Sequence, residues 1–193
     1  METEEIREKK EPKRLPVWAC ILLFALGLFV CMGLYGTIGF GLLSLILGDE
    51  ARHPGLLVYT VTEANMLLSV LTPAVILLYF ERRPFSDLGL TLKGHVRGLW
   101  YGLLVAMLLY LIGFGLSLAI GEVEVTGFQF DPLNLLGTFV FCLLVALTEE
   151  IMMRGYILGR LLHTRMNKFL ALFVSALLFA LLHIFNPNVA FLP

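Results

Sequence analysis

Long stretches without charged residues constrain the fold of this chain more than any other feature. Asp, Glu, Lys and Arg do not occur in four apolar stretches, at residues 16–48, 66–80, 99–120 and 133–148. A run of about 18 or more apolar residues is typical of a membrane-spanning helix, because a helix satisfies its own backbone hydrogen bonds inside the bilayer. We therefore expect an all-α, polytopic transmembrane helical bundle.

The apolar stretches and the charged segments between them define the expected organisation. We predict about five spans, near residues 16–47, 57–80, 98–120, 132–160 and 169–186. They form one transmembrane domain over residues 15–193, which follows a charged cytoplasmic tail over residues 1–14. Lys and Arg concentrate on the cytoplasmic side of membrane proteins, and here they gather in the tail and in two alternate loops, near residues 82–97 and 160–168. This alternation predicts a cytoplasmic N-terminus.

Net charge and cysteine content exclude several other classes of protein. The formal net charge is −1, which favours no nucleic-acid partner and leaves the lipid bilayer as the expected surroundings. Cys20, Cys31 and Cys142 are widely spaced and lie inside apolar stretches, so they match neither a disulfide framework nor a paired metal motif. We expect them to pack as small apolar side chains.

Three charged residues interrupt the fourth apolar helix. Glu149, Glu150 and Arg154 follow sixteen apolar or neutral residues, and each mid-membrane charge costs about 2.5–3.5 kcal/mol. Such residues are expected to face protein or a water-filled cavity. Glu150 and Arg154 are four residues apart and can pair on one helix face, whereas Glu149 points about 100° away. The alternative is that the helix ends near Thr148 and the charges lie in the membrane interface.

The fifth apolar helix contributes one titratable side chain, His183, with Phe179 one turn earlier. A single histidine in an apolar helix is more often a packing residue than a ligand. Here, however, Glu150 lies about 15 Å from Arg160 and His183 about 22 Å from Lys168, at 1.5 Å per residue, so antiparallel helices bring them to similar depth. Neighbouring helices can then hold the histidine and a glutamate around one water molecule or one metal ion.

These residues resemble the first two motifs of the CAAX prenyl protease and bacteriocin-processing (CPBP, Abi) family of intramembrane metalloproteases. The resemblance covers roughly residues 80–187. The similar segments are Glu149-Glu150-x-x-x-Arg154, Phe179-x-x-x-His183, Leu88-Gly89-Leu90 after a basic pair, and the Arg154-Gly155 step.

The resemblance implies an intramembrane endopeptidase that activates water against a membrane-delivered peptide or prenylated protein. It assigns Glu149 as the base, Glu150 with Arg154 as a supporting pair, Phe179 as a pocket wall and His183 as the partner of the water or metal. A divalent metal such as zinc, with Glu149 and His183 as ligands, is one form of this site, and glutamate with water alone is the other. The resemblance also implies the plasma (inner) membrane of a prokaryote.

The chain departs from the family pattern at a third motif, which pairs a histidine with a polar residue on a further helix. The printed sequence shows no such motif before Pro193, so we expect a fragment or a degenerate member that is not a competent peptidase as it stands. Two alternatives stay open. One is a non-enzymatic membrane protein of the same fold, such as a bacteriocin self-immunity factor or a scaffold, and the other is a transporter fragment.

Overall fold

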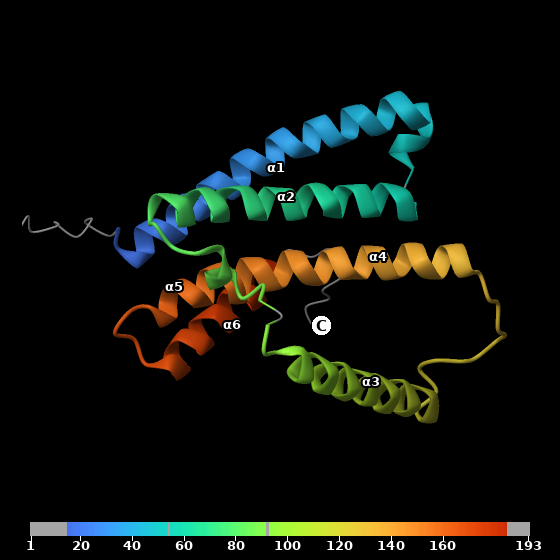
Figure 1. Ribbon diagram of the computed structural model, residues 1–193. Helices are drawn as coiled ribbons and strands as arrows, with labels where there is room; N and C mark the ends of the chain where they lie inside the picture. The colour runs from blue at the N-terminus through green and yellow to red at the C-terminus, as the bar shows by residue number, and fades with distance from the viewer. Residues whose placement is uncertain (1–14, 54, 92, 185–193) are drawn as a thin grey trace, which may run out of the picture.

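The computed structural model describes residues 15–53, 55–91 and 93–184, and the regular elements in these residues are all helices (Figure 1). The predicted tail over residues 1–14 and the end of the last predicted span lie outside the described residues. The elements, in chain order, are α1 (Val17–Leu47), η1 (Gly48–Arg52), α2 (Leu56–Phe80), η2 (Phe85–Leu88), α3 (Val96–Ala119), α4 (Pro132–Glu149), η3 (Glu150–Leu158), α5 (Gly159–Leu162) and α6 (Lys168–Ile184).

Four helical stretches are long and apolar enough to cross a membrane. Three are α1, α2 and α3, and the fourth is the continuous stretch α4–η3–α5, which runs from Pro132 to Leu162. The fifth, α6, is apolar but has only 17 residues. The predicted bundle of about five spans is therefore confirmed, and the chain is an integral, multi-pass membrane protein.

The fourth span begins where its sequence provides a cap. The Asp131 carboxylate accepts hydrogen bonds from the backbone N–H groups of Leu133 and Asn134, both at 3.1 Å. Pro132 occupies the first helical position, where its missing N–H costs nothing. At the other end of α4 the backbone continues into a π-helix, η3, instead of stopping near Thr148. The alternative in which the helix ends before the charged motif is thus wrong.

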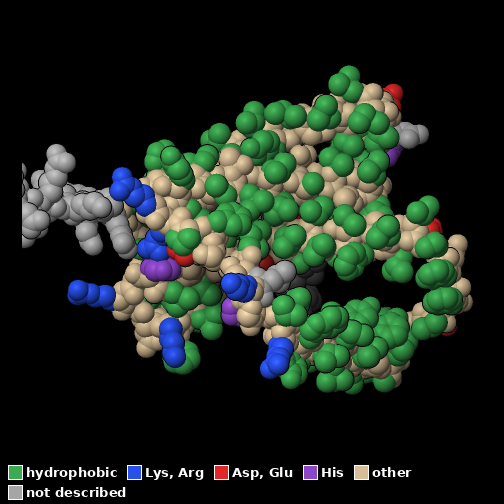
Figure 2. All heavy atoms as spheres, in the orientation of Figure 1, with side chains coloured by type: hydrophobic (Ala, Val, Ile, Leu, Met, Phe, Trp, Pro, Cys, Tyr) green, Lys and Arg blue, Asp and Glu red, His purple; other side chains and the backbone are tan. Residues whose placement is uncertain are grey.

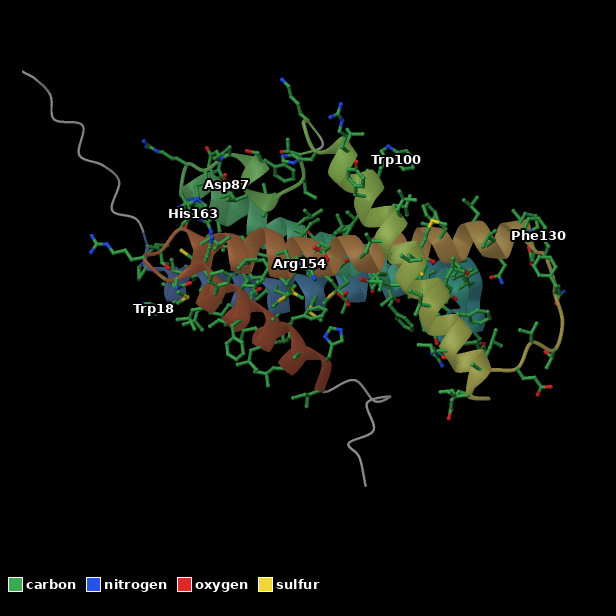
Figure 3. The ribbon with its side chains drawn as sticks, turned by 90° about the horizontal axis from the view of Figure 1, so that it is seen from below. Trp18, Asp87, Trp100, Phe130, Arg154 and His163 are labelled. Carbon is green, nitrogen blue, oxygen red and sulfur yellow. The ribbon has the colours of Figure 1, made fainter. Side chains whose placement is uncertain are left out.

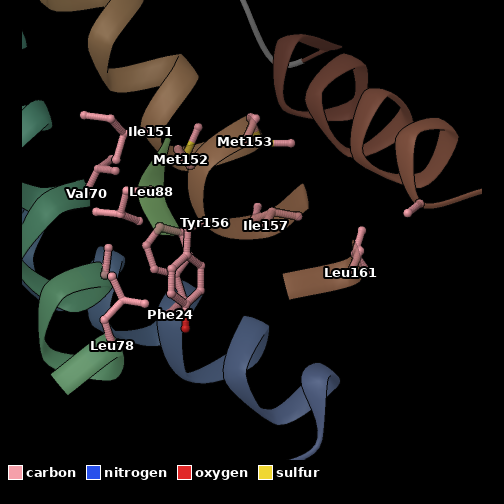
Figure 4. Packing of buried hydrophobic residues seen from close by; sticks show 12 residues of the cluster. Phe24, Val70, Leu78, Leu88, Ile151, Met152, Met153, Tyr156, Ile157 and Leu161 are labelled. Atoms are coloured by element: carbon pink, nitrogen blue, oxygen red, sulfur yellow. The ribbon is translucent and has the colours of Figure 1, made fainter. Parts of the chain in front are cut away.

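The core of the bundle lies where η3 crosses α1 and α2 (Figure 4). Tyr156 is the largest fully buried side chain, and its ring stacks on Phe24 with the centroids 4.3 Å apart. The short η2 segment fills the space beside them, and its Leu88 is buried. The backbone of Leu88 approaches η3 so closely that a Cβ atom at Gly155 would lie 2.7 Å from the Leu88 carbonyl oxygen. Gly155 is therefore required for this packing.

The third helix is separate from this core. None of the residues of α3 is buried, and α3 lies apart from α4 in Figure 1. Its apolar side chains are exposed along its whole length, from Val96 to Leu118. Consequently α3 does not cover the face of η3 that carries the charged motif.

Basic side chains gather at one end of the bundle, where α1 begins and α2 ends (Figure 2). Trp18, Asp87 and His163 lie near this end, which we call the basic end, and Phe130 lies at the opposite end (Figure 3). The opposite end also contains η1, and we call it the η1 end. The two basic loops thus lie at the same end, as the alternation of charged loops requires.

One arginine of the basic loops is not a loop residue. Arg160 lies in α5, is buried, and pairs with Glu81 at the end of α2. Its guanidinium also lies 5.0 Å from the centroid of the Tyr156 ring. Arg160, which the sequence places at the start of the basic loop, therefore lies inside the protein, where Glu81 neutralises it.

The Cys20 thiol belongs to the same buried group, donating a hydrogen bond of 2.7 Å to Glu81 Oε1. Cys20 is buried as expected, but it makes this polar contact in addition to apolar packing. Arg83 adds a second cation, with its Nε 3.6 Å from Glu81 Oε2. We call Cys20, Glu81, Arg83 and Arg160 the buried ionic cluster.

Candidate peptidase site

The two adjacent glutamates lie at the junction between α4 and η3, and the helix directs them to different sides. Glu149 is the last residue of α4 and faces α6, where its Oε1 lies 3.5 Å from His183 Nε2. Glu150 is the first residue of η3 and pairs with Arg154 on the same helix. The predicted divergence of the carboxylates and both predicted pairs are confirmed.

A hydrogen bond within α6 determines which nitrogen of His183 faces the glutamate. Its Nδ1 lies 2.9 Å from the backbone carbonyl oxygen of Phe179. A carbonyl oxygen only accepts hydrogen bonds, so Nδ1 carries a proton. The ring of Phe179 lies against the imidazole, with the centroids 4.4 Å apart. Phe179 therefore holds the histidine through both its backbone and its ring, and Nε2 is directed toward Glu149.

The chemistry of this pair calls for a proton donor between the two side chains. A neutral His183 with its proton on Nδ1 presents a lone pair at Nε2, and the Glu149 carboxylate also only accepts. At 3.5 Å, two acceptors are held together either by a proton on the imidazole or by a water molecule that donates to both. The pair is therefore suited to binding and polarising one water molecule.

A pocket of about 120 Å³ opens next to Glu149, between η3 and α6. Arg154 and Phe179 line it together with Ser175, which is buried and donates a hydrogen bond of 3.2 Å to the Met153 carbonyl oxygen. No sequence pattern indicates a role for Ser175, because a serine in an apolar helix usually bonds its own backbone. This contact ties α6 to η3 beside the glutamates.

The supporting pair is less buried than expected. The side chains of Glu150 and Arg154 are 51% and 64% exposed. The sequence predicts that they face protein or a wet cavity. Arg154 does line the pocket, but both side chains are largely on the surface of the described residues, because α3 does not cover this face of η3. Each charge is instead neutralised by the other.

The described residues do not provide a complete zinc site. Catalytic zinc is bound by three protein ligands and keeps an open position, whereas Glu149 and His183 supply two donors. Within residues 15–53, 55–91 and 93–184, His, Cys, Asp and Glu side chains form no group of three that could hold a metal ion. Glu149 and His183 are therefore the two donors that the described residues would offer to a metal ion or to a water molecule.

The fold and this site define a helical membrane protein with a glutamate–histidine pair beside an intramembrane pocket. The family described as type II CAAX prenyl endopeptidase Rce1-like matches residues 131–193. The matched segment begins at the cap of α4 and contains all five predicted site residues. The resemblance to CAAX-type intramembrane proteases is thereby confirmed for this segment. Comparisons with curated proteins and with solved structures each gave no match.

Proposed function

We propose that the chain carries the catalytic centre of an intramembrane endopeptidase, in which Glu149 and His183 activate water. The observation that carries this proposal is the contact of 3.5 Å between Glu149 Oε1 and His183 Nε2, beside the pocket between η3 and α6. The Glu–His pair belongs to the segment similar to CAAX-type endopeptidases. A peptide or a prenylated protein in the membrane is the proposed substrate.

In the proposed reaction the water oxygen attacks the scissile carbonyl carbon while its proton passes to Glu149. His183, held by Phe179, keeps the water in place through Nε2. Collapse of the tetrahedral intermediate breaks the C–N bond, and the proton on Glu149 passes to the leaving amine. Arg154 lines the pocket and, beyond its pair with Glu150, has further N–H donors that can face the substrate.

Donors to the developing oxyanion set a further requirement for the rate. Removing one donor to the developing oxyanion typically slows acyl transfer about 10²–10³-fold. Residues 185–193, which follow α6, lie outside the described residues. The expectation of low activity therefore stays a prediction.

The proposed orientation places the N-terminus and the basic end in the cytoplasm. The gathering of basic side chains at that end supports it, since Lys and Arg concentrate on the cytoplasmic side. We further propose the plasma membrane of a prokaryote as the location.

The test is hydrolysis in ¹⁸O-labelled water by protein expressed from its natural gene and reconstituted in liposomes. The substrate is a farnesylated peptide with a C-terminal CAAX sequence, and the label is sought by mass spectrometry in the new carboxylate. Replacing Glu149 by Gln should lower the rate about 10²–10⁴-fold, the usual contribution of a general base. Glu124→Gln is the matched control, since Glu124 is exposed in the loop after α3.

Label that enters the product equally with Glu149→Gln and with the natural protein would contradict the assigned base. Failure of the natural protein to release labelled product would contradict the enzymatic proposal. That result would favour the non-enzymatic membrane protein of the same fold.

A further inference from the structure

A second polar pocket lies between α1 and α2 and shares no lining residue with the pocket beside Glu149. The two helices cross near the basic end and diverge toward the η1 end (Figure 1). Where they diverge, a pocket of about 230 Å³ opens between them. Its polar lining consists of Thr62, Glu63, Asn65 and Ser69, and its apolar lining includes Met32, Phe40, Leu43 and Met66.

Glu63 is a carboxylate within a membrane-spanning helix, and nothing in the proposed peptidase reaction uses it. The side chain is half-buried. The ion pairs formed among the described residues involve other carboxylates and leave Glu63 without a Lys, Arg or His partner. An ionisable residue at this position is costly unless a cation or a polar cavity compensates it.

The position of Glu63 along α2 indicates where such a cation comes from. Glu63 is 17 residues from Phe80, the last residue of α2, which corresponds to about 26 Å of helix. Charged residues follow Phe80 directly and mark that boundary of the hydrocarbon. Because the hydrocarbon core is about 30 Å thick, Glu63 lies roughly 5 Å inside the opposite boundary, within reach of lipid headgroups.

The neighbouring side chains favour a group that donates several hydrogen bonds. Asn65 lies directly against Gly39 of α1, where a Cβ atom would come within 1.9 Å of the amide nitrogen. Gly39 thus leaves room for the amide. The Asn65 amide oxygen and the Ser69 hydroxyl can accept hydrogen bonds in addition to the Glu63 carboxylate. A primary ammonium has three N–H donors for these acceptors, whereas a quaternary ammonium has none.

We propose that this pocket binds the primary ammonium group of a membrane amphiphile, with the ammonium at Glu63 and the hydrocarbon chain along the apolar lining. Two sources carry this chemistry: an ethanolamine phospholipid and a free long-chain amine. The site is independent of the glutamate–histidine pair, so it stands whether or not the chain cleaves peptides.

The test measures which lipids stay bound to the purified, intact protein. Detergent-solubilised protein is mixed with equal amounts of dioleoylphosphatidylethanolamine and dioleoylphosphatidylcholine, and the retained lipids are counted by native mass spectrometry. We expect about tenfold preferential retention of the ethanolamine lipid, which corresponds to about 1.4 kcal/mol. Dodecylamine should displace it, and dodecanol, which has the same chain without the charge, should not.

Two variants test the pocket in different ways. Glu63→Gln removes the charge and should bring the retention ratio close to one. Gly36→Leu keeps the charge and fills the pocket, because Gly36 lines it and a Cβ atom there meets nothing within 4 Å. Gly33→Leu is the matched control, since Gly33 has equally open surroundings and does not line the pocket. It should retain the ethanolamine lipid like the natural protein.

Loss of selectivity in Glu63→Gln and Gly36→Leu, with selectivity kept in Gly33→Leu, supports the proposal. Binding of dodecylamine at this site without selective lipid retention assigns the free amine as the source. The proposal is overturned if the natural protein distinguishes neither lipid nor dodecylamine, or if Glu63→Gln retains the same selectivity. A polypeptide bound at the pocket instead of a lipid also overturns it.

Discussion

Two of the glutamate–arginine pairs among the described residues have opposite surroundings. In the buried ionic cluster, the side chains of Glu81 and Arg160 are 9% and 5% exposed, whereas those of Glu150 and Arg154 are 51% and 64% exposed. The buried pair joins the end of α2 to α5, two segments 79 positions apart. The exposed pair joins residues one helical turn apart. The same two residue types therefore hold distant segments together in the buried pair and remain accessible to solvent in the exposed pair.

This contrast indicates different roles for the pairs. A buried pair is strongly destabilising to break, because the remaining charge is left without compensation in a dry environment. An exposed pair contributes little to stability, since solvent screens it and the long side chains lose entropy. We therefore expect mutations in the buried ionic cluster to unfold the protein, and mutations of the exposed pair to affect reactivity.

The largest expected effect follows from breaking the buried pair. Arg160→Met should lower the free energy of unfolding by about 3–5 kcal/mol, because the buried Glu81 then keeps only the longer contact of 3.6 Å with Arg83 as its cation. The measurement is the midpoint of unfolding in detergent, by circular dichroism. The double variant Glu81→Leu with Arg160→Met should recover much of the loss, since no charge is left uncompensated. A single variant as stable as the natural protein would show that the pair is not desolvated.

A smaller loss of stability is expected at the contact between η2 and η3. Gly155→Ala places a Cβ atom 2.7 Å from the Leu88 carbonyl oxygen, so the backbone must shift, at a cost of about 1–3 kcal/mol. Gly159→Ala is the matched control, because its Cβ atom would lie at an ordinary 3.5 Å from the Asp87 carbonyl oxygen. Equal unfolding midpoints for the two variants would contradict the close packing of η2 on η3.

The smallest effect on stability is expected at the exposed pair. Arg154→Met should change the free energy of unfolding by less than about 1 kcal/mol. Cleavage of the farnesylated peptide should nevertheless fall about tenfold, because Glu150 loses its partner and the pocket loses a cation. Arg165→Met, at an exposed position after α5, is the control for loss of one positive charge. If Arg154→Met unfolded the protein as readily as Arg160→Met, the comparison between the pairs would fail.

Local sequence patterns were sufficient to predict the spans and the pairing of the site. The charge-free stretches predicted every long helix. Counting residues from the basic loops predicted that His183 lies at the same depth in the membrane as the glutamates. Both predictions depend on helix geometry alone, which is regular. The contact between Glu150 and Arg154, one helical turn apart, follows from the same regularity.

Long-range packing explains what the sequence did not reveal. In the sequence Arg160 resembles a loop residue, because Glu81, the carboxylate that pairs with it, lies far away in the chain. The exposure of Glu150 and Arg154 depends on where α3 lies, and an evenly apolar helix carries no periodic pattern that indicates its partner. Likewise, no sequence pattern indicates the π-helix from Glu150 to Leu158, which packs against α6 through the Ser175 hydrogen bond.

The π-helical geometry of η3 has a consequence for how this segment tolerates change in length. A π-helix accommodates more residues per turn than an α-helix, and such segments are frequent at functional sites. Deleting one residue from η3 without a change in its winding would rotate the part before the deletion relative to the part after it. Glu149 would then turn away from His183, or Arg160 would turn away from Glu81. The number of residues between Glu149 and Arg160 therefore determines the direction in which each side chain points. Single substitutions within η3 should be better tolerated than insertions or deletions.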